Sequence, residues 1–252
     1  MKKLVVVATC LCALAAGAAS VSYVQRRPVY RFPGFPDAPS PSIRLELAQR
    51  LGWAQFHGQF GQDKWIIGVV FPGVKSGYFV DVGAADGVIF SNTKALEDLG
   101  WTGVAIDPFP TNWSTRKCLL FREVVSKRSG ETVEFRVSGE VGGIVETLGR
   151  YRTMTEKDPT VRLTTTTIAD VLERARAPRY IHYVSLDVEG AEYDVLQAFP
   201  FSTREVGAFT IEHNGEEPNR SLIRSLLESK GYRFVRQQVV EDWYVGPARD
   251  GS

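Results

Sequence analysis

The chain has 252 residues, of which 44% are hydrophobic and 23% charged, and these globular values exclude a fibrous protein and a chain disordered throughout. Thirty basic residues against 29 acidic ones leave a net charge of +1, so no nucleic-acid partner is expected. Of three cysteines only Cys118 lies outside the apolar N-terminus, which excludes a disulfide framework, and no Cys/His spacing resembles a zinc site.

The N-terminus carries a long apolar segment. Residues 4–24 have no formal charge, two lysines precede them, and Arg26 and Arg27 follow. A helix of about 21 residues spans roughly 30 Å, the thickness of the hydrocarbon core of a bilayer. The length and the arginine pair favour a retained single-pass membrane anchor, whereas the Ala-Gly-Ala run at 16–18 favours a cleaved secretory signal. Retention is the preferred interpretation, and the positive-inside rule then favours a cytoplasmic domain, while a cleaved signal would export it.

A proline-rich segment separates this N-terminus from the rest of the chain. Residues 28–41 contain five prolines, which exclude a helix and favour an extended spacer. The predicted organisation is therefore an anchor or signal over 1–27, a linker over 28–41 and a globular domain over 42–252.

The globular domain alternates helical and strand patterns along the chain. The alternation predicts an α/β fold with a doubly wound, mostly parallel sheet. The last two strands are linked by only two residues and must be antiparallel. In chain order we predict helices 42–56 and 63–71, strand 78–82, helix 91–99, strand 103–106, helix 112–118, strands 122–125 and 132–137, helix 168–175, strand 181–186, helix 191–198, strand 206–211, helix 220–229, and strands 232–236 and 239–244.

The loop after the first predicted strand has the most informative pattern. It reads D-V-G-A-A-D-G over 81–87, and Gly83 and Gly87 allow the backbone to turn tightly beside a ligand. The spacing differs from a dinucleotide-binding G-x-G-x-x-G loop, and Asp81 and Asp86 would repel a phosphate. A cationic or zwitterionic nucleoside such as S-adenosylmethionine suits the loop better, and Gly83→Val is expected to block such a ligand while leaving the fold intact. The alternative is an ordinary glycine-rich turn between a strand and a helix.

A second acid follows the next predicted strand. Asp107 lies 26 residues after Asp81, and an acid at that place in a nucleotide site accepts hydrogen bonds from ribose hydroxyls. Asp107 followed by Pro108 also suits a helix cap, which is the alternative interpretation.

These motifs resemble those of the FkbM-type methyltransferases. The resemblance implies a class I, Rossmann-like fold that uses S-adenosylmethionine, usually for O-methylation of small molecules or glycans. It extends from Gly61 to Phe234 and is carried by G-Q-D-K-W-I (61–66), F-V-D-V-G-A-A-D-G (79–87), S-N-T (91–93), G-W-T-G (100–103), I-D-P (106–108), S-L-D-V-E-G-A-E (185–192) and T-I-E-H-N (210–214). The predicted cofactor-binding residues are Asp81, Gly83, Ala84, Asp86, Gly87, Asn92 and Asp107.

The predicted catalytic residues follow two later strands. The carboxyl ends of parallel strands form the ligand crevice of a doubly wound sheet, so Asp187 is expected to face the glycine loop. It is the first candidate to orient or deprotonate the acceptor, with Glu212 and His213 as further candidates. Glu189 and Glu192 can instead simply begin a helix, where acids are favoured.

A metal site is an alternative interpretation of these acidic residues. Asp81, Asp187 and Glu212 together could hold a divalent cation. The family gives no firm reason for one, so no metal is predicted.

Two functions from different classes are consistent with the sequence. The first is a membrane-tethered, S-adenosylmethionine-dependent methyltransferase whose partners are a small-molecule or glycan acceptor and the membrane, through residues 4–24. The second is a non-catalytic subunit of the same fold that is anchored in a larger membrane complex and braces its other subunits. The intact glycine loop, Asp107 and Asp187 favour the enzyme.

Overall fold

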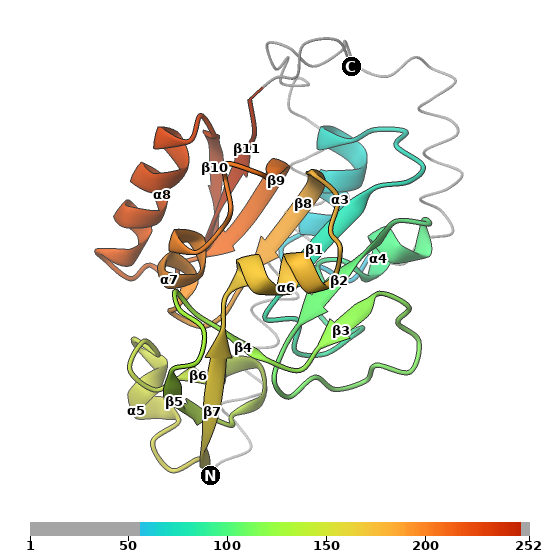
Figure 1. The fold of residues 1–252 in the computed structure, drawn as a ribbon. Coiled ribbons are helices and arrows are strands. Elements are labelled where there is room, and N and C mark those ends of the chain that lie inside the picture. Colours follow the sequence, from blue (N-terminus) through green and yellow to red (C-terminus); the bar gives the residue numbers. More distant parts are fainter. Residues whose placement is uncertain (1–55, 248–252) are drawn as a thin grey trace. The chain divides into compact units, whose positions relative to one another are not determined.

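The computed structural model describes residues 56–247, which are built around a seven-stranded sheet (Figure 1). Its strand order is β10-β11-β9-β8-β1-β2-β3, and the five strands from β9 to β3 are parallel. β11 is inserted antiparallel between β9 and β10, which confirms the predicted antiparallel pairing of the last two strands. The fold is thus mixed α/β and consistent with a Rossmann-like sheet. The strands are β1 (Tyr78–Val82), β2 (Thr102–Ile106), β3 (Leu119–Phe121), β8 (Tyr180–Leu186), β9 (Glu205–Glu212), β10 (Arg233–Gln238) and β11 (Glu241–Val245).

Helices pack on both faces of this sheet because its central strands are apolar on both sides. On one face α6 (Ile168–Arg174), α7 (Glu192–Gln197) and α8 (Asn219–Ser229) share one buried apolar cluster with the strands. Tyr244 of β11 belongs to that cluster, so the neighbouring Trp243 points to the opposite face, where it stacks on Trp65 with ring centroids 4.6 Å apart. Trp65 ends α3 (Gln62–Trp65), which continues into the π-helix η1 (Ile66–Val70), and α4 (Lys94–Asp98) follows β1.

A second, smaller sheet was not predicted. It has the order β4-β7-β5-β6 and is built from the chain between β3 and α6. The strand predicted over 132–137 is β5, whereas of the one predicted over 122–125 only residues 124–125 form a strand, β4. Its elements are β4 (Val124–Val125), β5 (Thr132–Arg136), the 3₁₀ turn η2 (Gly139–Val141), β6 (Gly143–Ile144), the short helix α5 (Tyr151–Met154) and β7 (Thr160–Thr166).

The helix predicted over 112–118 was wrong. Asn112 has a left-handed backbone with φ of 51°, and the segment forms a turn instead. The buried guanidinium of Arg116 holds this turn by donating to the carbonyl of Gly87 and the hydroxyl of Ser91, both at 3.0 Å. Tertiary hydrogen bonds therefore replace helical ones here.

Several expectations fall on residues that the structure does not describe. The anchor or signal over 1–27, the linker over 28–41 and helix 42–56 up to residue 55 lie outside residues 56–247. Within 56–247 no helix is long and apolar enough to cross a membrane.

Candidate active site

A hollow lies at the carboxyl ends of β1, β2 and β8, where the small sheet meets the large one. The large sheet contributes Gly83, Asp107 and Asp187, which follow these three strands, and the small sheet contributes Phe135 and Ile144. The hollow and the open solvent at its mouth together take up about 490 Å³. This is the place at which a doubly wound sheet binds ligands.

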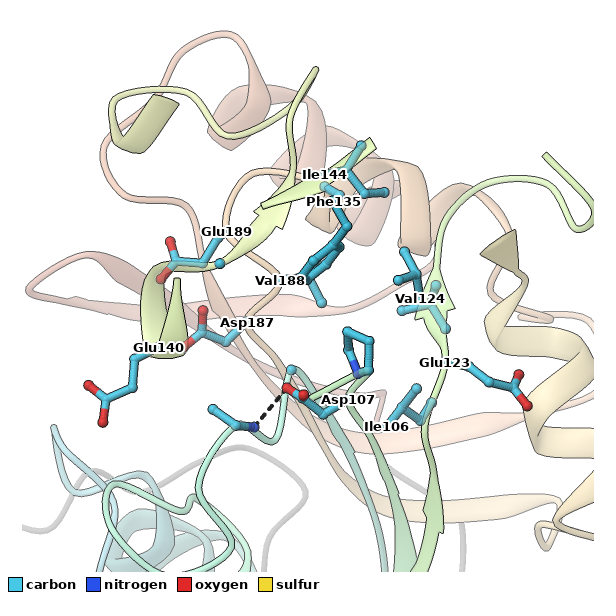
Figure 2. A pocket seen from close by; sticks show the side chains of 17 residues that line it. Ile106, Asp107, Glu123, Val124, Phe135, Glu140, Ile144, Asp187, Val188 and Glu189 are labelled. Carbon is cyan, nitrogen blue, oxygen red and sulfur yellow. Dashed lines mark hydrogen bonds between the residues drawn. The ribbon is translucent and has the colours of Figure 1, made fainter. Parts of the chain in front are cut away.

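The two halves of the hollow differ in chemistry (Figure 2). Carboxylates gather on one side, where Asp187, Glu189 and Glu140 lie. Apolar side chains form most of the other side, where Glu123 also lies, paired with Arg174, and Asp107 lies between the two halves. The hollow therefore suits a ligand with a flat apolar part and a cationic or hydroxyl-bearing part. The apolar wall consists of Ile106, Val124, Phe135, Ile144 and Val188.

Asp107 ties the glycine loop to the end of β2. One carboxylate oxygen accepts from the backbone N–H of Ala85 at 2.9 Å, and the other accepts from Phe109 N–H at 2.7 Å. Burial raises the pKa of Asp107, and these two backbone donors oppose that shift. A carboxylate has about four lone-pair sites, so Asp107 can still accept hydrogen bonds from ligand hydroxyls.

The two glycines of the loop make room for other parts of the protein. Gly83 has φ of 80°, and a Cβ built there would lie 1.6 Å from the backbone oxygen of Asp187. A Cβ at Gly87 would lie 2.8 Å from the backbone oxygen of Asn112. Gly83 therefore permits the β1 loop to meet the end of β8, which corrects the expectation that a larger residue would leave the fold intact.

The other predicted cofactor-binding residues lie behind the hollow or beside it, and none lines it among the described residues. Asp81 is buried and accepts from the Thr93 hydroxyl at 2.5 Å, while Asn92 donates to the Ser185 hydroxyl at 2.9 Å. Asp86 accepts from the backbone N–H groups of its own loop. Ala84 and Gly87 are buried in the same loop. Their roles toward a cofactor stay predictions: Asp86 holds the loop, while Asp81 and Asn92 join the segment before α4 to β1 and β8.

Three carboxylates, which we call the acidic group, converge at the acidic end of the hollow. Oxygens of Asp187, Glu189 and Glu212 lie within 4.8 Å of one another. Burial and the neighbouring carboxylates Glu212 and Glu189 raise the pKa of Asp187 well above its usual range. Burial, followed by repulsion from Glu212, raises the pKa of Glu189 to about 9. A carboxyl group with the pKa of Glu189 is protonated at neutral pH and is a strong base once ionised.

The same three residues could hold a cation by geometry, because carboxylate oxygens are ligands that hard cations prefer. The sequence pattern suggested Asp81 in place of Glu189, but the Asp81 carboxylate accepts from Thr93 and is not part of the group. The prediction that no metal is bound stays a prediction.

Glu192 shapes the loop that carries Asp187. It is fully buried at the start of α7, and one of its oxygens accepts from the backbone N–H groups of Val188 and Gly190 at 3.1 and 2.9 Å. Burial raises its pKa to about 7. The interpretation of Glu192 as a helix-start residue therefore agrees with its contacts.

His213 does not share the hollow with Asp187. Its Nδ1 accepts from Gly215 N–H at 2.9 Å, and its Nε2 lies 3.3 Å from a carboxylate oxygen of Asp242. Asp242 is also paired with Arg220 and Arg224, so the His213 ring belongs to a buried charged network beneath the strand end. The geometry gives His213 no contact with the acidic group, and its catalytic role stays a prediction without support.

Sequence reasoning missed the residues of the apolar wall and those that hold the acidic group together. The wall comes mostly from the unpredicted small sheet. Asn214 and Arg150, which bond each other at 2.6 Å, are 64 positions apart in the chain, and no local pattern links them.

Comparison with known families agrees with this geometry. A family model described as the methyltransferase FkbM domain matches residues 81–234, which is more than half of the chain. The match begins in β1, includes every residue that lines the hollow, and ends in β10. No curated protein matches the chain at a significant level.

Proposed function

Because the chain belongs to the FkbM methyltransferase family, we propose that it transfers a methyl group from S-adenosylmethionine to an oxygen of a small molecule or glycan. Family membership suggests methyltransferase activity, while the donor, the acceptor and the oxygen are part of the proposal. The observation that carries it is the divided hollow, with an apolar wall on one side of Asp107 and carboxylates on the other.

The residues of the hollow fit this methyl donor. The apolar wall of Val124, Phe135 and Ile144 suits a flat adenine ring, and Asp107 can accept hydrogen bonds from the ribose hydroxyls. The carboxylates at the other end suit a positive charge. S-adenosylmethionine, when bound, supplies an electrophilic methyl group on a positively charged sulfur.

Asp187 is the residue proposed to activate the acceptor. Its carboxylate accepts the proton of the acceptor hydroxyl while that oxygen bonds to the methyl carbon and the carbon–sulfur bond breaks. The proton thus ends on Asp187, the methyl group on the acceptor, and the electron pair of the broken bond on sulfur. The raised pKa of Asp187 favours this role, because a base must hold the proton it takes.

We expect the full-length protein to bind S-adenosylmethionine, measured by isothermal titration calorimetry. Asp107→Asn removes one of the two acceptor oxygens and should raise Kd by about tenfold or more, since hydrogen bonds to charged groups contribute about 1.5–3 kcal/mol. Asp98→Asn removes the same charge from the end of α4, outside the hollow, and should leave Kd unchanged. No heat of binding at millimolar cofactor, with circular dichroism showing a folded protein, would remove the enzymatic proposal.

The membrane tether is proposed on the sequence of residues 4–24. A retained segment would hold the domain at the cytoplasmic surface of a membrane. The domain would then face the cytoplasm, in which the methyl donor is made. Intact-mass measurement of the protein from its native membrane fraction should give the full-length mass. A mass lacking roughly the first 18 residues would show a cleaved signal instead.

A further inference from the structure

One amide joins two of the three carboxylates in the acidic group. The side-chain nitrogen of Asn214 donates to Glu189 at 2.9 Å and to Glu212 at 2.8 Å. Both hydrogens of the amide are therefore used, one on each carboxylate. These two carboxylates are the neighbours that act most strongly on Asp187.

The other end of the amide is held by the segment that leads into α5. Arg150 donates to the side-chain oxygen of Asn214 at 2.6 Å, and the Tyr151 hydroxyl lies 3.3 Å from the same oxygen. The guanidinium can only donate, so the amide oxygen must face it and the amide nitrogen must face the carboxylates. Arg150 thus sets the orientation in which Asn214 bridges Glu189 and Glu212.

The backbone on both sides of this bridge is in a left-handed conformation. Asn214 has φ of 51° and Glu189 has φ of 56°. Asparagine tolerates this region, whereas a glutamate there is uncommon and its conformation must be held by its surroundings. The hydrogen bond to Asn214 is one of the contacts that hold it.

We propose that Asn214 is a positioning residue: its amide joins Glu189 to Glu212 and thereby fixes how both carboxylates face Asp187. The inference rests on the proposed function, in which Asp187 takes the acceptor proton. Its consequence is a defined pH dependence, because the hydrogen bond from the Asn214 amide stabilises ionised Glu189 and opposes the rise in the pKa of Glu189 that burial causes.

The charged and titratable groups around the bridge come from five elements. Carboxylates dominate, so any change at Asn214 acts on a set of coupled groups. They are Asp187 and Glu189 before α7, Glu192 in α7, Glu212 at the end of β9, Glu241 in β11 and, from the segment at α5, Arg150 and Tyr151.

The test replaces the donating amide by an accepting group of the same shape. In full-length Asn214→Asp, the titration of the buried carboxyl groups, followed by ¹³C NMR, should move upward by about one pH unit or more. Asn214→Gly removes the amide without straining the left-handed backbone and should move the titration in the same direction by less. Both variants should keep the wild-type circular dichroism.

Asn112→Asp is the matched control. Asn112 also has φ of 51°, and its amide donates to Asp86 at 3.2 Å, outside the acidic group. This variant should leave the titration of the acidic group unchanged. An unchanged titration in Asn214→Asp, or an equal shift in the control, would overturn the proposal.

A second readout separates this inference from the proposed function. The readout is transfer from labelled S-adenosylmethionine to acceptors in a cell lysate, measured across pH. In Asn214→Asp the acidic limb of this pH profile should shift to higher pH. Damage to folding alone would instead lower transfer equally at every pH. Wild-type protein that titrates as expected but shows no transfer contradicts the proposed function and leaves the bridge supported.

Discussion

Asp187→Asn should lower methyl transfer by about 10²–10⁴-fold while the Kd for S-adenosylmethionine stays within a few fold. The amide keeps the size of the side chain and cannot accept the acceptor proton. Transfer from the labelled cofactor to acceptors in a cell lysate measures the first effect, and calorimetry measures the second. Unchanged transfer would remove Asp187 from the catalytic residues, and no transfer by the wild type would favour a non-catalytic subunit.

The pH dependence of wild-type transfer has a definite sign. Asp187 must be ionised to take a proton, and burial with two neighbouring carboxylates raises its pKa. Transfer should therefore increase as pH rises through the titration of the acidic group and then level off. In Asp187→Asn the remaining activity should lack this dependence.

Stability provides a control for the same variant. The pKa of Glu189 is raised from 4.5 to about 9 in the folded protein. The part of the free energy of unfolding that is linked to Glu189 is therefore fully present below about pH 4.5 and is lost as pH rises toward 9. Removing the charge of Asp187 relieves part of the repulsion, and the variant should be no less stable than the wild type at pH 8. Asp194→Asn, which changes a partly exposed acid of α7 paired with Lys127, should leave transfer unchanged.

The strands β1, β2, β8 and β9 were predictable because each is a short, mostly apolar run that ends at or next to a polar residue or glycine, whereas β3 was not predicted. The small sheet was not, because β7 reads T-V-R-L-T-T-T and alternates between exposed and partly buried positions. A threonine-rich alternation of this kind also fits a surface loop. The apolar wall depends on that sheet, so the sequence alone could place the acidic end of the hollow but not its other half.

The adjacent pair Glu212 and His213 shows why the sequence alone could not assign every site residue. Glu212 is the last residue of β9 and His213 follows it, and successive side chains of an extended chain point to opposite faces. Glu212 reaches the group around Asp187, while His213 reaches Asp242. The residues of a motif can be adjacent in sequence and still face different environments, and only the three-dimensional arrangement assigns them.

Gly83 is held against the end of β8 by hydrogen bonds on both sides. Gly83 N–H donates to the Ile106 carbonyl at 2.9 Å, and Asp187 N–H donates to the Val82 carbonyl at 2.9 Å. Neither backbone can withdraw without breaking one of these bonds, because they continue the pairing of β1 with β2 and β8. The contact between Gly83 and Asp187 is therefore part of the sheet and positions the proposed catalytic residue.

Gly83→Ala should consequently destabilise the full-length protein by about 3 kcal/mol or more, measured by urea denaturation followed by tryptophan fluorescence. The added Cβ would lie 1.6 Å from the Asp187 backbone oxygen. Gly130→Ala is the matched control, because Gly130 has φ of 84° and a Cβ there meets nothing within 4 Å. It should cost only the backbone strain, about 1 kcal/mol. Equal losses in the two variants would show that the loop yields at Gly83, and that its contact with Asp187 does not hold the two strand ends together.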